Sequence, residues 1–221
     1  MQTLVTFDLF SALIDSRAGG SAAFAAFGAD RRWARSGGEV YDTWDALNKA
    51  AQRDCRSWVS YDVLARGALT ECYERLGLSG NPARDTASVI ETMSEWPLWP
   101  DVSEGLPRLA MHYRIGLLSN VDNDIFSRTR AAPFLVADNV FTSERLGVYK
   151  PHPHIYERAR ERAGSLVHVA TSARDVRGAV ESGIEVIRLR RPGHGLDADG
   201  PAPLRQVESL TELEKVLSED S

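Results

Sequence analysis

Five residues of this sequence could together make and break a covalent bond to a small substrate. Asp8 ends a short apolar run, Ser119 and Asn120 end another, Lys150 lies in a segment rich in Gly and Pro, and Asp175 lies further along the chain. An ionised aspartate can attack carbon or phosphorus and form a covalent ester or acyl phosphate. A lysine beside it would keep that carboxylate ionised through its opposite charge.

The other members of the set fit supporting roles in the same reaction. Ser119 and the backbone amides after it can bind an anionic group of a substrate by hydrogen bonds. Asp175 could orient Lys150, activate a water molecule, or serve only as a negative charge at a helix N-terminus. Taken singly, Asp8 is more typical of a helix cap and Lys150 of a solvated surface. The order and spacing of the five residues, rather than any one of them, therefore indicate a catalytic site.

The segments around these residues alternate between strand and helix patterns. Residues 3–8 are typical of a short buried strand, because they are β-branched and aromatic. After residue 100 we expect helices over 102–113, 124–131, 153–163 and 174–182, and strands over 114–118, 139–142, 166–170 and 184–189. Such alternation predicts an α/β fold, a Rossmann-like parallel sheet with helices on both faces. Ligands bind such sheets at the carboxyl ends of the strands, where the five residues fall.

Between the first strand and the rest of the sheet the pattern is helical only. Apolar residues recur at helical spacing over 22–35, 40–52, 61–76 and 83–95. This predicts an all-helical cap domain, residues 15–97, inserted into a discontinuous core domain, residues 1–14 and 98–221. The Arg-rich segment 188–195 is interpreted as an exposed connection before the final helix.

Composition narrows the classes of partner. The net charge of −5 over 221 residues gives no electrostatic footprint for nucleic acid or an anionic membrane. No stretch approaches the roughly 20 apolar residues of a membrane span, and the N-terminus lacks a basic region before its apolar run. Cys55 and Cys72 form no metal-binding pattern and are expected to be reduced thiols. We expect a cytoplasmic monomer or homodimer whose partner is a small anionic substrate.

The motifs that carry these residues resemble those of one superfamily. Residues 7–15, FDLFSALID, look like the first motif of haloacid dehalogenase-like hydrolases, with Asp8 as nucleophile. Residues 117–120, LLSN, are similar to the second motif. Residues 147–153, GVYKPHP, resemble the third, with Lys150 as its lysine.

The fourth motif completes the resemblance, which spans the whole chain. Residues 169–179, which include Asp175, look like this motif. The resemblance implies that Asp8, Lys150 and Asp175 are catalytic. It places Tyr156 and Ser172 among the substrate-binding residues.

The position two residues after the nucleophile distinguishes two branches of the superfamily. Phosphatases usually carry there an acid that protonates the leaving alkoxide, whereas Phe10 resembles the aromatic residue of type II 2-haloacid dehalogenases. A halide is a weak base and needs no proton, so the loss of the acid penalises phosphate-ester cleavage far more, by roughly 10²–10⁴ in rate. Phe10 is therefore expected to contact the substrate.

The metal requirement also separates the branches. The acid that binds Mg²⁺ in phosphatases falls here at Ala170. The dehalogenase interpretation requires no metal and no cofactor. The phosphatase alternative would place Mg²⁺ on Asp8 and Asp175.

The sequence departs from the dehalogenase pattern at several places. Asp45 follows Trp44 where the resemblance implies an arginine that receives the halide, and Lys49, Arg53 or Arg56 could replace it from the next turns. Ser11-Ala12 stands in place of Gly-Thr after the nucleophile. Ala170 and Ser172 replace a serine and an asparagine.

The leading hypothesis combines these assignments. Asp8 displaces a leaving group from carbon, while Ser119 and the Asn120 amide hold the substrate's carboxylate. Lys150 stabilises the nucleophile, and a water positioned by Asp175 hydrolyses the ester. The alternatives are a Mg²⁺-dependent small-molecule phosphatase and a catalytically silent member that binds a ligand.

Overall fold

A computed structural model describes residues 3–219. Its centre is a six-stranded sheet in the order β3-β2-β1-β4-β5-β6, in which every neighbouring pair is parallel. The strands are β1 (Leu4–Phe7), β2 (Arg114–Ser119), β3 (Val140–Thr142), β4 (Leu166–Ala170), β5 (Glu185–Leu189) and β6 (Arg205–Val207). The predicted α/β class is confirmed. Only β6 has no counterpart among the predicted strands.

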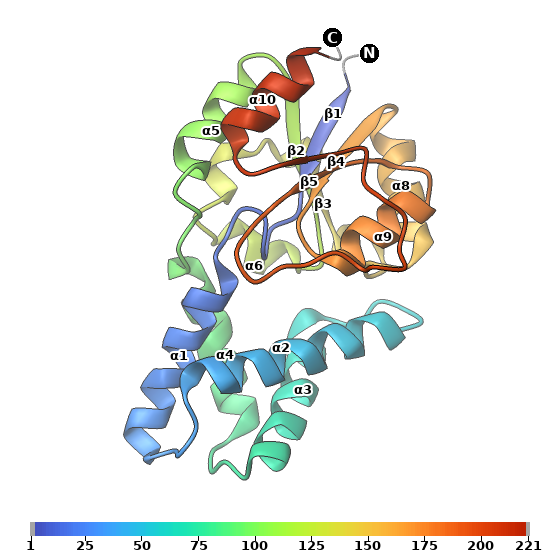
Figure 1. The fold of residues 1–221 in the computed structure, drawn as a ribbon. Helices are drawn as coiled ribbons and strands as arrows, with labels where there is room; N and C mark the ends of the chain where they lie inside the picture. The colour runs from blue at the N-terminus through green and yellow to red at the C-terminus, as the bar shows by residue number, and fades with distance from the viewer. Residues whose placement is uncertain (1–2, 220–221) are drawn as a thin grey trace.

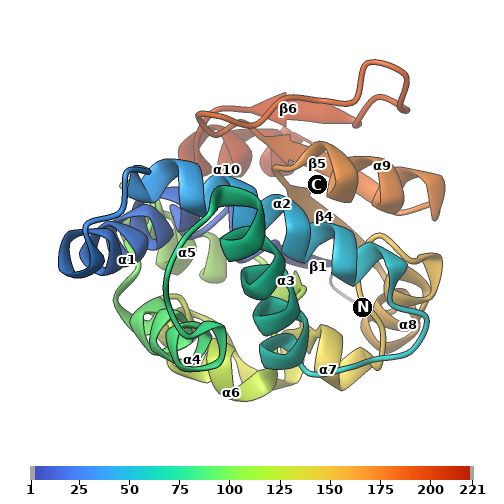
Figure 2. The same cartoon turned by 90° about the horizontal axis from the view of Figure 1, so that it is seen from below.

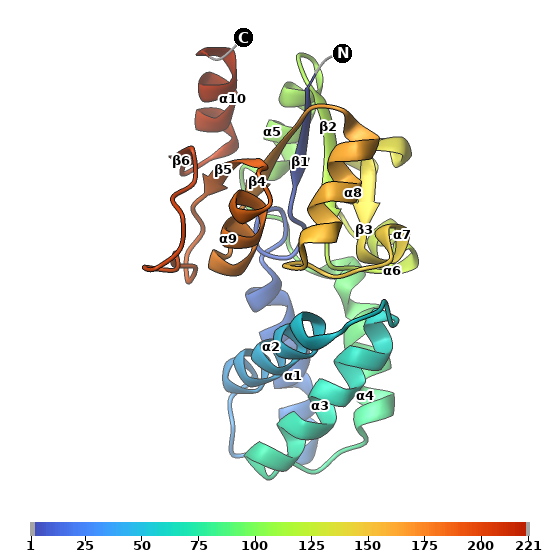
Figure 3. The same cartoon turned by 90° about the vertical axis from the view of Figure 1, so that its right-hand side faces the viewer.

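Helices cover both faces of the sheet (Figures 1 and 3). α5 (Val102–Ala110) and α10 (Leu210–Glu219) lie on one face, and α8 (Pro153–Ala163) and α9 (Ala173–Glu181) lie on the other. Side chains alternate along β1, so that Val5 and Phe7 join the apolar cluster under α5 and α10, while Leu4 joins the cluster under α8 and α9. Burial on both faces explains why the strands are almost continuously apolar.

Two short helices, α6 (Asn123–Ser127) and α7 (Ser143–Leu146), follow β2 and β3. The prediction of a helix over 124–131 is wrong in its second half. The Ser127 hydroxyl donates to the Asp124 carbonyl and the Thr129 hydroxyl to the Phe126 carbonyl, so side chains take over acceptors that a continuing helix would use. Single-turn 3₁₀ segments follow at Ala132–Phe134 and Ala137–Asn139.

A separate group of four helices lies below the carboxyl ends of the strands (Figure 1). It consists of α1 (Ser16–Arg31), α2 (Gly37–Asp54), α3 (Tyr61–Leu76) and α4 (Pro82–Thr92), followed by one 3₁₀ turn at Met93–Glu95. We call it the helical unit. Seen from its own side, α2 and α3 lie in front of the sheet (Figure 2). The boundaries of a cap domain at residues 15 and 97 stay a prediction.

Large aromatic side chains fill the interior of the helical unit. Trp44 is 2% exposed and packs edge-on against Phe24, with ring centroids 5.6 Å apart. It also packs against Tyr41, whose ring is tilted and lies 6.0 Å away. Rings of this size build a core from few residues. No helix within residues 3–219 is both long and apolar enough to cross a lipid bilayer.

Candidate active site

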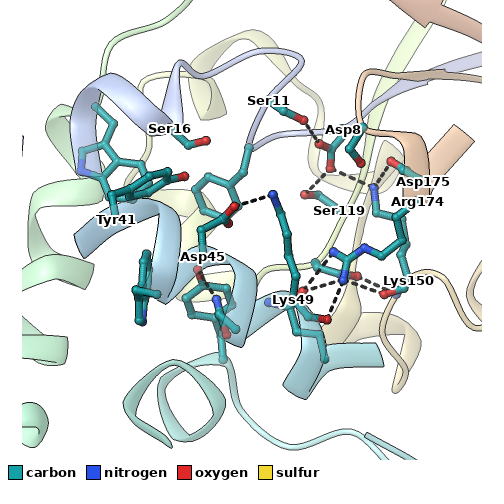
Figure 4. A pocket seen from close by; sticks show the side chains of 18 residues that line it. Asp8, Ser11, Ser16, Tyr41, Asp45, Lys49, Ser119, Lys150, Arg174 and Asp175 are labelled. Atoms are coloured by element: carbon teal, nitrogen blue, oxygen red, sulfur yellow. Dashed lines mark hydrogen bonds and ion pairs between the residues drawn. The ribbon is translucent and has the colours of Figure 1, made fainter. Parts of the chain in front are cut away.

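Asp8 lies directly after β1, the strand between β2 and β4. Its side chain is buried and accepts three hydrogen bonds (Figure 4). Ser119 and Lys150 donate to Oδ1 at 3.0 and 2.8 Å, and the Ser11 hydroxyl donates to Oδ2 at 2.9 Å. The two carboxylate oxygens are therefore unequal, because only Oδ1 faces a cation.

Lys150 is fully enclosed by the site. Its ammonium donates to Asp8 Oδ1, to the Leu118 carbonyl at 2.9 Å and to Asp175 Oδ2 at 2.5 Å. An ammonium has three hydrogens, so each is used. Burial acts to lower the pKa of Lys150, but attraction to Asp175 and Asp8 outweighs it and raises that pKa above its usual value. Lys150 stays charged.

Asp175 is held from three sides. Lys150 and His168 Nε2 contact its Oδ2, the latter at 3.1 Å, and the Tyr156 hydroxyl donates to its Oδ1 at 2.8 Å. Burial acts to raise the pKa of Asp175, but the charges and hydrogen bonds of Lys150 and His168 hold it far below its usual range. Such a carboxylate is a weak base. Its contacts favour the role of orienting Lys150 over that of activating water.

Tyr156 lies away from the cavity in which a substrate would bind. Its side chain is fully buried and does not line the cavity above Asp8. The hydroxyl is instead used by Asp175. Tyr156 therefore contacts Asp175 and not this cavity, and its predicted substrate contact stays a prediction.

Ser119 and Asn120 line the cavity, but their side-chain donors are already used. The Ser119 hydroxyl donates to Asp8 and accepts from the Leu9 amide at 3.3 Å. Asn120 exchanges hydrogen bonds with the backbone of Lys150, at 2.7 and 3.0 Å, and donates to Gln52 at 2.9 Å. These two side chains fix the nucleophile and the Lys150 loop, which leaves their hydroxyl and amide hydrogens unavailable to a substrate.

A small cavity lies between Asp8 and the helical unit. Its volume is about 50 Å³, room for a few water molecules or one small organic acid. Of the predicted site residues, Asp8, Phe10, Ser119, Asn120, Lys150, Ser172 and Asp175 line it. The helical unit and its flanks add residues that the sequence did not single out, among them Ser16, Tyr41, Asn48, Gln52, Tyr61 and Trp96.

Phe10 forms an apolar wall of this cavity. Its ring lies 6.2 Å from that of Tyr61 and 6.0 Å from that of Trp96, centroid to centroid. The position that could supply a leaving-group proton is thus packed among aromatic rings. This position therefore supplies no acid to a leaving group that needs protonation.

Positive charge reaches the cavity from two further residues (Figure 4). Lys49 of α2 lines it and pairs with Asp45 at 2.5 Å, and Arg174 of α9 lines it from the side of the sheet. Of the three cations considered as replacements for the missing arginine, only Lys49 faces the cavity, because Arg53 and Arg56 are exposed. The sequence does not predict Arg174, because its place at the cavity depends on a contact between α9 and α2.

The carboxylates present do not fit a magnesium site. Both oxygens of Asp8 and both of Asp175 already accept hydrogen bonds from protein donors, and Lys150 occupies the space between the two. Residues 3–219 contain no group of three or more His, Cys, Asp or Glu side chains that could hold a metal ion. Mg²⁺ that bridged Asp8 and Asp175 would have to displace the Lys150 ammonium, which already lies between the two carboxylates.

The loop after Asp8 is fixed by residues from distant segments. Ser11 has φ 140°, a conformation that a residue with a side chain rarely adopts. The Trp99 indole donates to the Ser11 carbonyl at 2.9 Å, and the buried guanidinium of Arg191 donates twice to the Ala12 carbonyl at 3.0 and 3.1 Å. The interpretation of 188–195 as an exposed connection is therefore wrong for Arg191, which also pairs with Asp101 at 2.8 Å. It is wrong too for Arg188 and Leu189, which are buried at the end of β5.

With this geometry in place, comparison with known proteins identifies the family. A family model described as haloacid dehalogenase-like hydrolase matches residues 3–183. The chain belongs to this family. It is therefore a hydrolase, as its motifs predict.

Among curated relatives, (S)-2-haloacid dehalogenase 4A of Burkholderia cepacia is 31% identical over 140 residues, 60% of each protein. This match thus spans less than two thirds of that relative. Pyrimidine 5'-nucleotidase YjjG of Escherichia coli (strain K12) is 27% identical over 235 residues, 98% of this chain and 94% of the relative. Both relatives are similar to this chain in sequence, and one is a dehalogenase whereas the other is a nucleotidase.

Solved structures share the whole fold. The L-2-haloacid dehalogenase from Xanthobacter autotrophicus superposes with a TM-score of 0.84 over 100% of both chains at 20% identity. The putative hydrolase YfnB from Bacillus subtilis, solved with magnesium bound, gives a TM-score of 0.76 over 98% of both chains at 16% identity. At these identities the likeness establishes the fold alone.

Proposed function

We propose that this hydrolase cleaves the carbon–halogen bond of small 2-halocarboxylates through a covalent ester on Asp8. The observation that carries the proposal is the pairing of a fixed, ionised network around Asp8 with an aromatic residue, Phe10, where an acid would assist an alkoxide. A halide leaves as a weak base and needs neither that acid nor a metal. The reaction therefore requires no cofactor. The dehalogenases among the relatives and structural neighbours, one of them solved with chloropropionic acid covalently bound, support this choice.

In the first step Asp8 acts as the nucleophile. Its Oδ2 accepts one neutral hydrogen bond, from Ser11, whereas Oδ1 accepts two, one from a cation. Oδ2 is the better nucleophile for that reason. It forms a bond to the substrate's α-carbon while the carbon–halogen bond breaks, and the halide leaves with the electron pair.

In the second step water hydrolyses the ester at the carboxyl carbon of Asp8. Negative charge develops on Oδ1, where Ser119 and Lys150 already donate, so these two groups form an oxyanion hole. The bond between the carboxyl carbon and Oδ2 breaks, and the 2-hydroxy acid is released. The water supplies the oxygen that restores Asp8, and the net proton goes to solvent.

A second candidate is a phosphatase that depends on Mg²⁺. It is favoured by the nucleotidase relative, whose similarity extends over 98% of this chain. It is disfavoured by Phe10 and by the engaged oxygens of Asp8 and Asp175.

Halide release distinguishes the candidates. Chloroacetate, bromoacetate and both enantiomers of 2-chloropropionate would be incubated with the wild type, with Asp8→Asn and with Asp124→Asn, which changes an exposed carboxylate on α6. We expect halide from the wild type and Asp124→Asn and none from Asp8→Asn. Phosphate release from a nucleoside monophosphate with Mg²⁺, together with no halide from any haloacid, would contradict the proposal. Ligand binding without either turnover would instead identify a silent member.

A further inference from the structure

The cavity poses an electrostatic problem for an anionic substrate. Three carboxylates line it, those of Asp8, Asp45 and Asp175. Asp8, Lys150 and Asp175 together carry a net charge of −1, so they repel an approaching anion. The Ser119 hydroxyl, which the sequence suggests for this task, is already used, and the backbone amide of Asn120 carries no net charge to offset that of an anion. Another group must neutralise the substrate's charge.

Two of the three cations that line the cavity already form ion pairs with carboxylates. Lys150 uses all three ammonium hydrogens, two of them on carboxylates. Lys49 forms an ion pair with Asp45. Neither lysine can neutralise a bound anion without leaving its present carboxylate partner without a counter-charge.

Arg174 is the remaining cation. Its guanidinium donates to the Lys49 carbonyl at 2.7 Å and contacts Gln52 Oε1 at 3.5 Å, and both acceptors are neutral. Within the part of the chain that the structure describes, it has no carboxylate partner. A guanidinium has five hydrogens in a planar fork that matches a carboxylate, so donors and charge both remain available.

The surroundings of Arg174 also suit an anion. Arg174 is the second residue of α9, at the positive end of the helix dipole. Ser172 precedes the helix, makes no capping hydrogen bond with its side chain and lines the same cavity. A hydroxyl, a guanidinium and a helix N-terminus thus meet at one wall. The contact with the backbone of α2 fixes the guanidinium at this wall.

We infer that Arg174 and Ser172 form the subsite that binds the substrate's carboxylate. The choice of a carboxylate rests on the proposed function. Arg174 is in this account a specificity-determining residue, because it selects acids over neutral halides of the same shape.

A binding experiment with a non-reactive acid tests this subsite directly. Isothermal titration calorimetry would measure propionate and its neutral isostere propionamide against the wild type, Arg174→Gln, Arg174→Lys and Arg177→Gln. Arg177 is the matched control, an exposed arginine of α9 that pairs with Glu181 and Asp197. Circular dichroism would confirm that each variant is folded, and Arg174→Lys retains the charge if Arg174→Gln does not fold.

We expect the wild type and Arg177→Gln to bind propionate equally and more tightly than propionamide. Arg174→Gln should weaken propionate binding roughly 10- to 100-fold, the usual effect of losing a hydrogen bond to a charged group. Arg174→Lys should fall between, since it keeps the charge and loses the fork. For 2-chloropropionate, Arg174→Gln should raise KM by a similar factor and change kcat less.

The inference is overturned if the wild type does not bind propionate, binds propionamide as well, or loses nothing in Arg174→Gln. It is overturned too if Arg174→Gln weakens chloride binding and leaves propionate unaffected, because Arg174 would then hold the halide. The proposed reaction fails separately. If propionate binding depends on Arg174 but the enzyme releases no halide from any haloacid, the carboxylate subsite is supported and the proposed reaction is contradicted.

Discussion

The ammonium of Lys150 lies between two buried carboxylates, 2.8 Å from Asp8 Oδ1 and 2.5 Å from Asp175 Oδ2. This single contact joins the nucleophile after β1 to the carboxylate on α9. It explains how two like charges share one buried site: the cation between them offsets their repulsion. It also makes Lys150 necessary for both structure and chemistry.

Replacing Lys150 by methionine should therefore destabilise the fold strongly. The change leaves two buried carboxylates without their cation, and breaking a buried pair in this way costs about 3–5 kcal/mol. Urea unfolding measures the loss. Lys49→Met is the matched control, because its ion pair with Asp45 is partly exposed and should be worth less than about 1 kcal/mol. Equal stability of the two variants would contradict the role given to Lys150.

Tyr156→Phe should separate positioning from substrate contact. The variant removes the hydrogen bond to Asp175 Oδ1 and should cost about 1.5–3 kcal/mol of stability, as for a buried bond to a charged group. We expect kcat for a haloacid to fall while KM stays unchanged. A raised KM with unchanged stability would restore Tyr156 to the substrate contacts.

Two substitutions of Ser11 distinguish the effect of its backbone strain from the effect of its hydroxyl contact with Asp8. Ser11→Gly relieves the strain at φ 140°, whereas Ser11→Ala keeps it, and both variants lose the donor to Asp8 Oδ2. The free energy of unfolding of Ser11→Gly should exceed that of Ser11→Ala by about 1–2 kcal/mol. Both should lower kcat by the same factor, up to about 10²-fold, since Oδ2 loses the contact that orients it. Different activities in the two variants would mean that the backbone, rather than the hydroxyl, positions Asp8.

Asp122 should make stability depend on pH. Burial, with smaller contributions from Glu144 and other nearby acids, raises its pKa to about 6, although the Tyr61 amide donates to it. Between about pH 4 and 6 the folded state then holds more protons at this group than the unfolded state, so stability falls as pH rises.

Asp122→Asn removes that dependence and keeps an acceptor for the Tyr61 amide. Relative to the wild type, we expect it to gain on the order of 1 kcal/mol between pH 4.5 and pH 7. This is less than the full shift would give, because the carboxylate is half-buried. Asp124→Asn, at an exposed position, should show no such gain. Parallel stability curves for Asp122→Asn and the wild type would contradict the raised pKa.

The elements that the sequence predicts well are those with local boundary signals. β4 and α8 match their predicted bounds, since Pro153 begins the helix and Gly164 follows its last residue. α1 instead begins at Ser16, before the predicted start, across Gly19 and Gly20. Glycine disfavours a helix, so the sequence gives no sign that the helix includes these residues. Both must nevertheless be glycine, because a Cβ at Gly19 would lie 2.3 Å from the ring of Trp96 and one at Gly20 would lie 2.2 Å from the ring of Tyr41. Tertiary packing decides that helix, and no local pattern shows it.

The same division applies to the candidate site. Asp8, Ser119, Lys150 and Asp175 follow from the order of the strands, because parallel strand ends share one edge. His168 and Arg174 do not, since His168 lies inside a buried strand and the direction of Arg174 depends on how α9 is rotated against α2. Contacts between distant elements require coordinates. The contact of the Tyr156 hydroxyl with Asp175 is of this kind.

A single turnover in H₂¹⁸O distinguishes a covalent ester on Asp8 from direct attack of water on the substrate. With enzyme in excess over 2-chloropropionate, we expect the peptide that contains Asp8 to gain ¹⁸O. The 2-hydroxy acid should carry unlabelled oxygen, because its oxygen comes from the carboxylate. Label in the product after the first turnover, with none in the peptide, would show direct attack by water and contradict the account.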